Sequence, residues 1–163
     1  LYVDRVAAIK KYMPYACIGC DVIVGFPGET EADFLETYQF LQSLDVSYLH
    51  VFTYSERANT LAADMPDAVL QDKRRRRNQA LRALSEMKRR EFYRQHLRTV
   101  RPVLFEQHKN PEMLSGYTDN YIKIELPADQ GELNTLAPAL LLNLSLDGET
   151  VQTSCALMSG TIG

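Results

Sequence analysis

Residues 21–30, DVIVGFPGET, decide the fold of the N-terminal part of this 163-residue chain. With residues 16–20 they form an almost unbroken apolar and β-branched run that ends at Pro27-Gly28. A continuous run, rather than an alternating one, indicates a strand that is covered on both faces, as in a parallel sheet. Thr30 and Asp33 have the spacing of a capping box, which predicts that a helix opens directly after the strand.

The elements around this stretch alternate between helix and strand. Helical spacing of apolar residues predicts a helix over residues 1–13 and another from Thr30 to about Leu44, and residues 47–54 read as a second strand. This order indicates β/α units with a parallel sheet. A long helix is expected from about Pro66 to about Leu97, roughly 40 Å at 1.5 Å per residue.

The pattern changes to short strands after Val100. Strands are expected near residues 103–105, 121–126 and 139–146, and Asp147-Gly148 is a hairpin signal before a returning strand over 150–157. Such spacing is typical of a small antiparallel β-barrel. The sequence thus predicts an α/β part followed by an all-β part, with a boundary near residues 98–102 and three segments: 1–65, 66–99 and 100–163.

Composition excludes several classes of protein. Hydrophobic residues make up 45% and charged residues 24% of the chain, which is a globular balance rather than that of a disordered chain. No apolar run approaches the roughly 20 residues of a membrane span, so no membrane partner is expected. Three cysteines favour reduced thiols and a cytoplasmic setting. The chain opens at Leu1 inside a helical pattern, which suggests a piece of a longer protein.

Charge is concentrated in the long predicted helix. Residues 70–101 hold 12 of the 18 Lys and Arg residues and three acids, a local charge of +9, whereas the rest of the chain carries −12. A basic block on an acidic protein suits a polyanion such as RNA. The alternative is a solvated helix face, and charge alone favours this alternative over an RNA-binding surface.

The Gly-Pro-Gly turn is the main candidate for chemistry. Ligands in parallel α/β folds bind at the carboxyl ends of strands, where glycines let a ligand approach the backbone. The turn matches neither a Walker loop nor a dinucleotide fingerprint. From its spacing alone, a tight strand-to-helix turn without a ligand is an equal alternative to a ligand site. Asp21 lies within the apolar strand, and a buried carboxylate there would need a bonding partner or a polar ligand site.

Other candidate groups are weaker. Cys17 and Cys20 have the Cys-x-x-Cys spacing but no second pair in the same domain, so no metal site is predicted. His50 is expected to be a packed core histidine. No set of residues forms a catalytic triad, and no catalytic residue is assigned. Tyr117, Tyr121 and Lys123 on the small barrel fit either an RNA-stacking surface or ordinary rim residues.

Three motifs together resemble one enzyme family. DVIVGFPGET with Ile18-Gly19 before it, and Tyr48–Arg57 (YLHVFTYSER), resemble the methylthiotransferase branch of the radical S-adenosylmethionine (SAM) enzymes. The pattern Gly116-x-Thr118-x-Asn120-Tyr121, after residues 103–106, resembles the TRAM domain that ends those proteins. The nearest branch acts on threonylcarbamoyladenosine beside the tRNA anticodon; isopentenyladenosine and ribosomal-protein branches are related.

The resemblance implies a transferase with SAM and two [4Fe-4S] clusters in the full-length protein. In that family reductive cleavage of SAM gives a radical that activates the adenosine C2–H, and the inserted sulfur is then methylated. Both cysteine clusters are absent from this chain. The expectation is therefore a C-terminal fragment of a radical SAM partial barrel, a basic linking helix and a TRAM barrel, inactive without the N-terminal part of the protein.

The resemblance also suggests which residues bind ligands. The residues expected near SAM are Asp21, Gly25, Pro27, Gly28 and Glu29. The residues expected to contact tRNA are Tyr54, Arg57, Arg74, Arg75, Arg76, Arg77, Lys88, Arg89, Arg90, Arg94, Tyr117, Tyr121 and Lys123. Two alternatives stay open: a non-catalytic RNA-binding TRAM module, and a methylthiotransferase that modifies a ribosomal protein.

Overall fold

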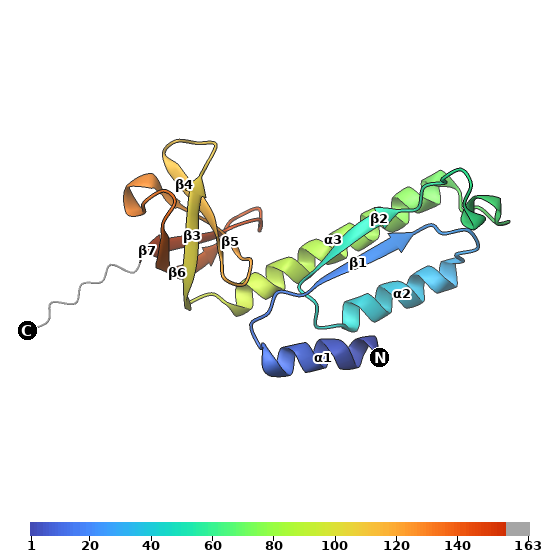
Figure 1. The fold of residues 1–163 in the computed structure, drawn as a ribbon, viewed down its shortest axis with the longest axis horizontal. Helices are drawn as coiled ribbons and strands as arrows, with labels where there is room; N and C mark the ends of the chain where they lie inside the picture. Colours follow the sequence, from blue (N-terminus) through green and yellow to red (C-terminus); the bar gives the residue numbers. More distant parts are fainter. Residues whose placement is uncertain (156–163) are drawn as a thin grey trace, which may run out of the picture. The chain divides into compact units, whose positions relative to one another are not determined.

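The computed structural model describes residues 1–155 and consists of two compact units, Leu1–Arg89 and Arg90–Gly163 (Figure 1). The boundary between the units falls inside the long helix α3 (Gln71–Gln95). The division into segments 1–65, 66–99 and 100–163 stays a prediction. No helix within residues 1–155 has the length and apolar character that crossing a membrane would require.

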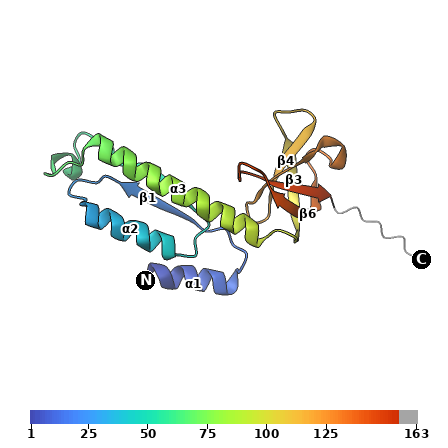
Figure 2. The same cartoon turned by 180° about the vertical axis from the view of Figure 1, so that it is seen from behind.

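The first unit has the predicted order of helix, strand, helix and strand. It comprises α1 (Tyr2–Tyr12), β1 (Gly19–Val24), α2 (Glu31–Ser43) and β2 (Tyr48–Thr53), followed by the short η1 (Leu61–Asp64) and by α3. The strands β1 and β2 are parallel, with Cys20 opposite Leu49, which confirms the prediction of a parallel pair. Figure 2 shows the same elements from behind.

Two helix starts illustrate how local chemistry sets the boundaries. At α2 the Thr30 Oγ1 accepts the Asp33 N–H at 3.2 Å and Asp33 Oδ2 accepts the Thr30 N–H at 2.9 Å, so the predicted capping box is present. The long helix begins at Gln71, later than the predicted Pro66. Asp67 has a φ of 62°, a left-handed conformation that cannot continue a right-handed helix.

The core of the first unit lies on one face of the two-stranded sheet. The buried cluster joins Cys20, Val24 and Leu49 from the strands to side chains of all three helices, namely Val6, Phe34, Leu41, Leu81 and Leu84. On the opposite face, Ile23 is 60% and Phe52 53% exposed. The prediction of cover on both faces is therefore wrong for the described chain, because every helix of this unit packs on the same side.

The second unit contains a closed five-stranded barrel. Its strands are β3 (Val100–Gln107), β4 (Met113–Thr118), β5 (Lys123–Pro127), β6 (Leu136–Leu144) and β7 (Val151–Cys155), with the short η2 (Ala128–Gln130) after β5. Their order around the barrel is β3-β4-β5-β7-β6. Phe105, Ile124 and Leu141 are fully buried inside it.

The barrel differs from its prediction in two respects. Strand β4 is not among the strands expected from the sequence, and its Ser115-Gly116 pair has low strand propensity. The barrel is also not wholly antiparallel: β5 and β7 pair in parallel, with Ile124 opposite Val151, since β7 inserts between β5 and β6 to close the barrel. The expected strand over 150–157 is present up to Cys155, and its last residues lie outside the described part.

Candidate functional site

The two motif segments of the first unit meet at one edge of the sheet. Because β1 and β2 are parallel, their carboxyl ends lie together, and the Tyr54 N–H donates to the Val24 carbonyl at 2.9 Å. The turn Gly25–Glu29 and the segment Tyr54–Arg57 therefore start from adjacent positions. We call these nine residues the motif edge; in open α/β sheets this edge is the usual ligand-binding position.

Glycines set the shape of the turn. Gly25 and Gly28 have φ values of 80° and 84°, which residues with a Cβ rarely adopt. A Cβ on Gly25 would also collide with the side chain of Arg74, whereas a Cβ on Gly28 would meet no atom within 4 Å. Gly28 thus leaves open space where a ligand can approach the backbone, while Gly25 is packed against the helix α3.

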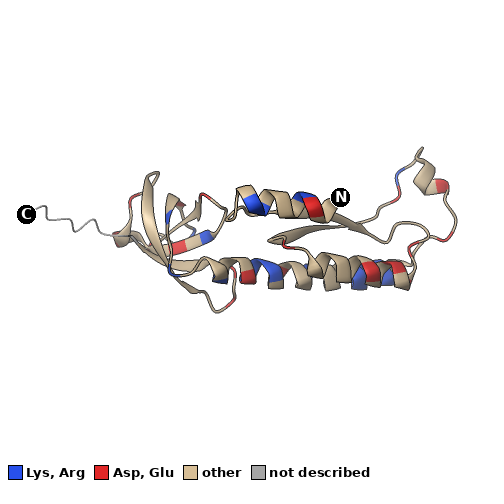
Figure 3. Ribbon diagram, turned by 90° about the horizontal axis from the view of Figure 1, so that it is seen from below, with Lys and Arg blue, Asp and Glu red and all other residues tan. Residues whose placement is uncertain are grey.

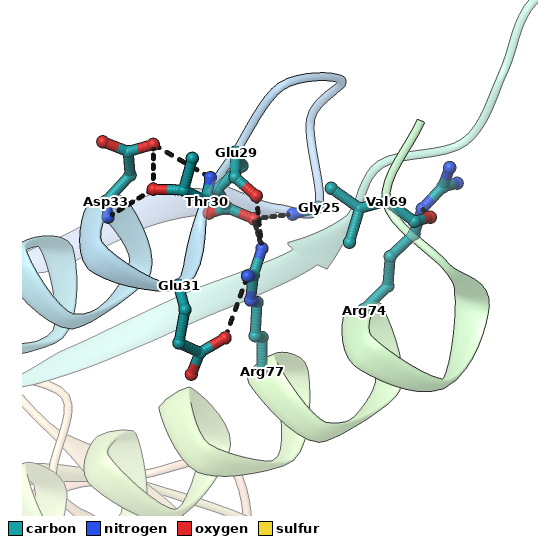
Figure 4. Close-up of polar contacts among 8 residues, drawn as sticks. All are labelled: Gly25, Glu29, Thr30, Glu31, Asp33, Val69, Arg74 and Arg77. Atoms are coloured by element: carbon teal, nitrogen blue, oxygen red, sulfur yellow. Dashed lines mark hydrogen bonds and ion pairs between the residues drawn. The ribbon is translucent and has the colours of Figure 1, made fainter. Parts of the chain in front are cut away.

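A buried arginine fixes this turn to α3 (Figure 4). Glu29 Oε2 accepts the Gly25 N–H at 2.5 Å and Arg77 Nη1 at 2.7 Å, and Arg77 Nη2 donates to Glu31 at 3.0 Å. The Arg77 side chain is 4% exposed and that of Glu29 14%. Burial lowers the pKa of Arg77, but hydrogen bonds to Glu31 and Glu29 outweigh it and raise the pKa overall, so the guanidinium stays charged.

A second arginine, Arg74, holds the other half of the motif edge. Its guanidinium donates to the Tyr54 carbonyl at 3.1 Å, to Glu56 at 2.5 Å and to the Val69 carbonyl at 2.7 Å. It also lies 5.4 Å from the centre of the Tyr54 ring. The hydrogen bond from Arg74 holds the pKa of Glu56 below its usual range.

The face of the sheet without helices adjoins the motif edge. We call its residues Asp21, Ile23, His50 and Phe52 the open sheet face; Asp21 pairs with His50 and Ile23 with Phe52 across the strands. Asp21 and His50 are both exposed, so the expectations of a buried carboxylate and a core histidine are wrong. Their side chains lie on the face of the sheet that no helix within residues 1–89 covers.

The basic residues expected to contact RNA separate into two groups. Arg74 and Arg77 are buried in the ion pairs above, which corrects the expectation that all four arginines of residues 74–77 face a nucleic acid. Lys88 Nζ donates to the carbonyls of Gln42 and Leu44 at the end of α2, and burial lowers its pKa. In the second unit, Arg90 donates to the Asp147 carbonyl at 2.7 Å.

The second group is turned outward. Arg75, Arg76, Arg94 and also Arg57 are exposed, and Arg89 is half-buried. Figure 3 marks the Lys and Arg residues along α3 in blue. A hollow beside this helix is lined by Thr53, Gln71, Arg75, Asn78, Gln79 and Arg82. Arg82 was missed in the sequence, although its spacing of seven residues from Arg75 places the two on the same helix face.

In the barrel, the third motif builds a turn that carries an aromatic pair. Thr118 Oγ1 donates to Asn120 at 2.6 Å and accepts the Ile122 N–H at 2.9 Å, and both side chains are buried. This turn holds Tyr121 at a φ of 63° with its side chain 72% exposed. The rings of Tyr117 and Tyr121 are 6.5 Å apart, and Lys123 is opposite Tyr117 on the next strand.

Residues 1–155 contain no group of three or more His, Cys, Asp or Glu side chains that could hold a metal ion. Cys20 is buried and Cys17 is half-buried, with its pKa raised by burial. The described residues therefore do not fit an iron–sulfur cluster, which takes three or four cysteine ligands.

Comparison with known proteins gives three informative relatives. The chain is 37% identical over 145 residues, 86% of its length, to the threonylcarbamoyladenosine tRNA methylthiotransferase of Bacillus subtilis (strain 168), and 37% identical over 125 residues, 76% of its length, to that of Aquifex aeolicus (strain VF5). It is 34% identical over 157 residues, 92% of its length, to the tRNA-2-methylthio-N(6)-dimethylallyladenosine synthase of Bacillus pumilus (strain SAFR-032).

These alignments cover 32%, 29% and 30% of the respective relatives, so the chain spans about a third of their length. No family model matches the chain. The relatives nevertheless align with both units, and they carry the activity that the motifs of the motif edge and the barrel turn suggested. The chain therefore belongs to the methylthiotransferase family that its sequence motifs indicated.

Proposed function

We propose that this chain is the C-terminal portion of a radical SAM methylthiotransferase that adds a 2-methylthio group to threonylcarbamoyladenosine in tRNA. The observation that carries the proposal is the position of the open sheet face beside the motif edge. Two relatives at 37% identity are named for this substrate, whereas relatives named for dimethylallyladenosine are 32–36% identical.

The residues at this position fit an adenosyl ligand. Ile23 and Phe52 offer exposed apolar surface for a purine ring, and the exposed Asp21 carboxylate can accept hydrogen bonds from ribose hydroxyls or an ammonium group. The open space at Gly28 lets a ligand reach the main chain. When bound, SAM would supply the radical and the methyl group; these residues would bind and orient it.

Glu29 does not fit the role of a direct ligand. Its carboxylate is committed to the Gly25 N–H and to Arg77, and little of it is exposed. We assign it to shaping the turn, and we keep Asp21, Gly25, Pro27 and Gly28 as the residues that frame the cofactor.

The RNA contacts are assigned to the outward residues of α3 and to the barrel turn. Arg75, Arg76 and Arg82 can each contact a phosphate, and no acid lies within ion-pair distance of Arg76 or Arg82 in residues 1–155. Tyr117 and Tyr121 offer rings for base stacking. Phosphate contacts of this kind give affinity that falls with salt concentration.

Nucleoside analysis of total tRNA from a deletion strain tests the reaction. We expect loss of the 2-methylthio derivative of threonylcarbamoyladenosine, restored by the wild-type gene. Loss of the methylthio group from dimethylallyladenosine instead would assign the chain to the other branch. If every tRNA nucleoside is unchanged, an RNA-binding module or a ribosomal-protein enzyme replaces this proposal.

A salt series of tRNA binding tests the RNA surface. Arg75→Gln and Arg76→Gln should each reduce the slope of log affinity against log salt by about one for every phosphate that the side chain no longer neutralises. Arg57→Gln replaces an exposed residue of the motif edge. Its salt slope tests in the same way whether RNA also contacts this edge of the first unit. Equal slopes for Arg75→Gln, Arg76→Gln and the wild type would remove α3 from the RNA surface.

A further inference from the structure

We propose that Arg77 and Arg74 are positioning residues for the SAM site: from α3 they hold the two halves of the motif edge in the shape that receives the cofactor. The inference rests on the proposed function. It assigns to two arginines of a basic run a role unrelated to RNA, and it makes α3 a part of the cofactor site.

Arg77 acts on the turn through Glu29. The same oxygen, Glu29 Oε2, accepts hydrogen bonds from the Gly25 N–H and from Arg77, so the guanidinium fixes the carboxylate that in turn fixes Gly25. Arg77 also donates to the Glu29 main-chain carbonyl at 3.0 Å. Without the guanidinium, Glu29 would be a poorly solvated anion, and such a group turns towards water. The Gly25 N–H would then lose the carboxylate oxygen that accepts its hydrogen bond.

Arg74 acts on both segments at once. Its aliphatic stem occupies the space where a Cβ of Gly25 would be, and its guanidinium binds the Tyr54 carbonyl and the Glu56 carboxylate. The Tyr54 ring packs edge-on against Phe26 of the turn, with ring centres 5.3 Å apart. One side chain therefore sets the distance between the turn and the segment that follows β2.

Direct contact of these arginines with RNA phosphates does not fit the geometry. Both side chains are almost completely buried. All three guanidinium nitrogens of Arg74, and both terminal nitrogens of Arg77, already donate to acceptors within the first unit, while Arg77 Nε is buried away from solvent. Their neighbours Arg75 and Arg76 have the same charge, lie on the same helix turn and are exposed. The run of four arginines thus contains its own matched control.

The test compares Arg77→Met with Arg76→Met in the whole, cluster-loaded enzyme. Three quantities are measured: the Kd for SAM by equilibrium dialysis, the Kd for tRNA, and the hydrogen–deuterium exchange of a peptide covering residues 22–34. We expect Arg77→Met to weaken SAM binding about tenfold, to accelerate exchange in this peptide, and to change the Kd for tRNA less than twofold. Arg76→Met should leave SAM binding and exchange unchanged and weaken tRNA binding.

A double variant separates positioning from direct contact. Glu29→Gln keeps an oxygen that accepts the Gly25 N–H and removes the unpaired charge, so Arg77→Met with Glu29→Gln should recover at least half of the lost SAM affinity on the logarithmic scale. If Arg77→Met does not fold, Arg77→Gln, which also removes the cation, gives the same comparison with and without Glu29→Gln.

The outcomes are distinguishable. A wild-type enzyme that does not bind SAM overturns the proposed function and this inference with it. Wild-type binding that Arg77→Met leaves unchanged overturns the inference alone. So does a loss of affinity without faster exchange in residues 22–34, or a loss that Glu29→Gln does not rescue, because either result would mean that Arg77 contacts SAM itself.

Discussion

The turn after β1 and the turn after β4 both belong to the sequence motifs of the family, but different interactions hold them. The Gly25–Glu29 turn depends on Arg77, which lies 48 residues later in the chain. The turn after β4 depends on Thr118 and Asn120, which are part of it. The first turn is therefore held by a residue far along the chain, whereas the second is held by residues of its own sequence.

This difference matches the proposed roles of the two turns. A turn held by a remote ion pair can be adjusted by the packing of α3, which suits a site that must receive a small cofactor. A turn closed by local hydrogen bonds is a rigid support, which suits the presentation of Tyr121 for stacking.

Glu29→Ala should destabilise the first unit by about 3 kcal/mol, because it leaves the Gly25 N–H without its acceptor and the buried Arg77 with only Glu31 as a carboxylate partner. Urea unfolding followed by circular dichroism reports on this unit, which contains most of the helix. Glu31→Ala is the control: its side chain is 68% exposed, and its loss should cost less than about 1 kcal/mol. Equal losses of stability in Glu29→Ala and Glu31→Ala would contradict the conclusion that Glu29 is the main partner of Arg77.

Gly116→Ala should destabilise the barrel by about 2–3 kcal/mol, since the added Cβ would collide with the main-chain carbonyl of Leu104 on the paired strand. Exchange rates of the Ile124 and Val103 amides measure this loss. In Gly28→Ala nothing collides, and only the left-handed backbone should cost about 1 kcal/mol. A loss at Gly28 as large as that at Gly116 would contradict the open space beside Gly28.

Thr118→Val should cost about 2 kcal/mol in the barrel, because it leaves the buried Ile122 N–H and Asn120 side chain without their shared partner. The effect should remain local: exchange in residues 22–34 should stay at the wild-type rate. The chemical shifts of the Tyr121 ring provide a second readout. If the shifts match the wild type, Thr118 does not hold the exposed tyrosine.

Acid should weaken both units through carboxylates that have lowered pKa values in the folded state. The hydrogen bond from Arg74 lowers the pKa of Glu56 below its ordinary 4.5, and that from Ser145 lowers the pKa of Asp147 below 3.8. Their contribution is complete above the unfolded values and is lost as pH falls through the folded ones. In unfolding measurements over a pH series, Glu56→Gln should reduce the loss of stability at low pH in the first unit alone. Asp147→Asn should reduce this loss in the barrel alone. A change in the other unit would contradict these assignments.

Much of this architecture follows from sequence pattern. The capping box at Thr30, the parallel pair β1 and β2, and the hairpin signal at Asp147-Gly148 depend on residues close together in the chain, where propensity and spacing determine the result. The motif segments were also found, because their residues are contiguous.

Burial was harder to predict, because it depends on what covers each face. The apolar run of β1 predicted a strand enclosed on both sides, yet Asp21 and Ile23 are exposed, since the elements that pack on the strand all lie on one face. The partners of Arg74 and Arg77 could not be predicted for the same reason. Contacts between residues 18 and 48 apart along the chain leave no periodic signal in the sequence.

The orientation of Arg74–Arg77 has a consequence for how clusters of basic residues are counted. Successive helical residues are rotated by about 100°, so four in a row spread over about 300° of the circumference. Such a run cannot meet a single flat surface, and here half of it points into the protein. The number of cations that a polyanion can reach then depends on which way each residue of the helix faces, and not on the length of the run. In α3 about half of the Lys and Arg residues are exposed and available for such contacts.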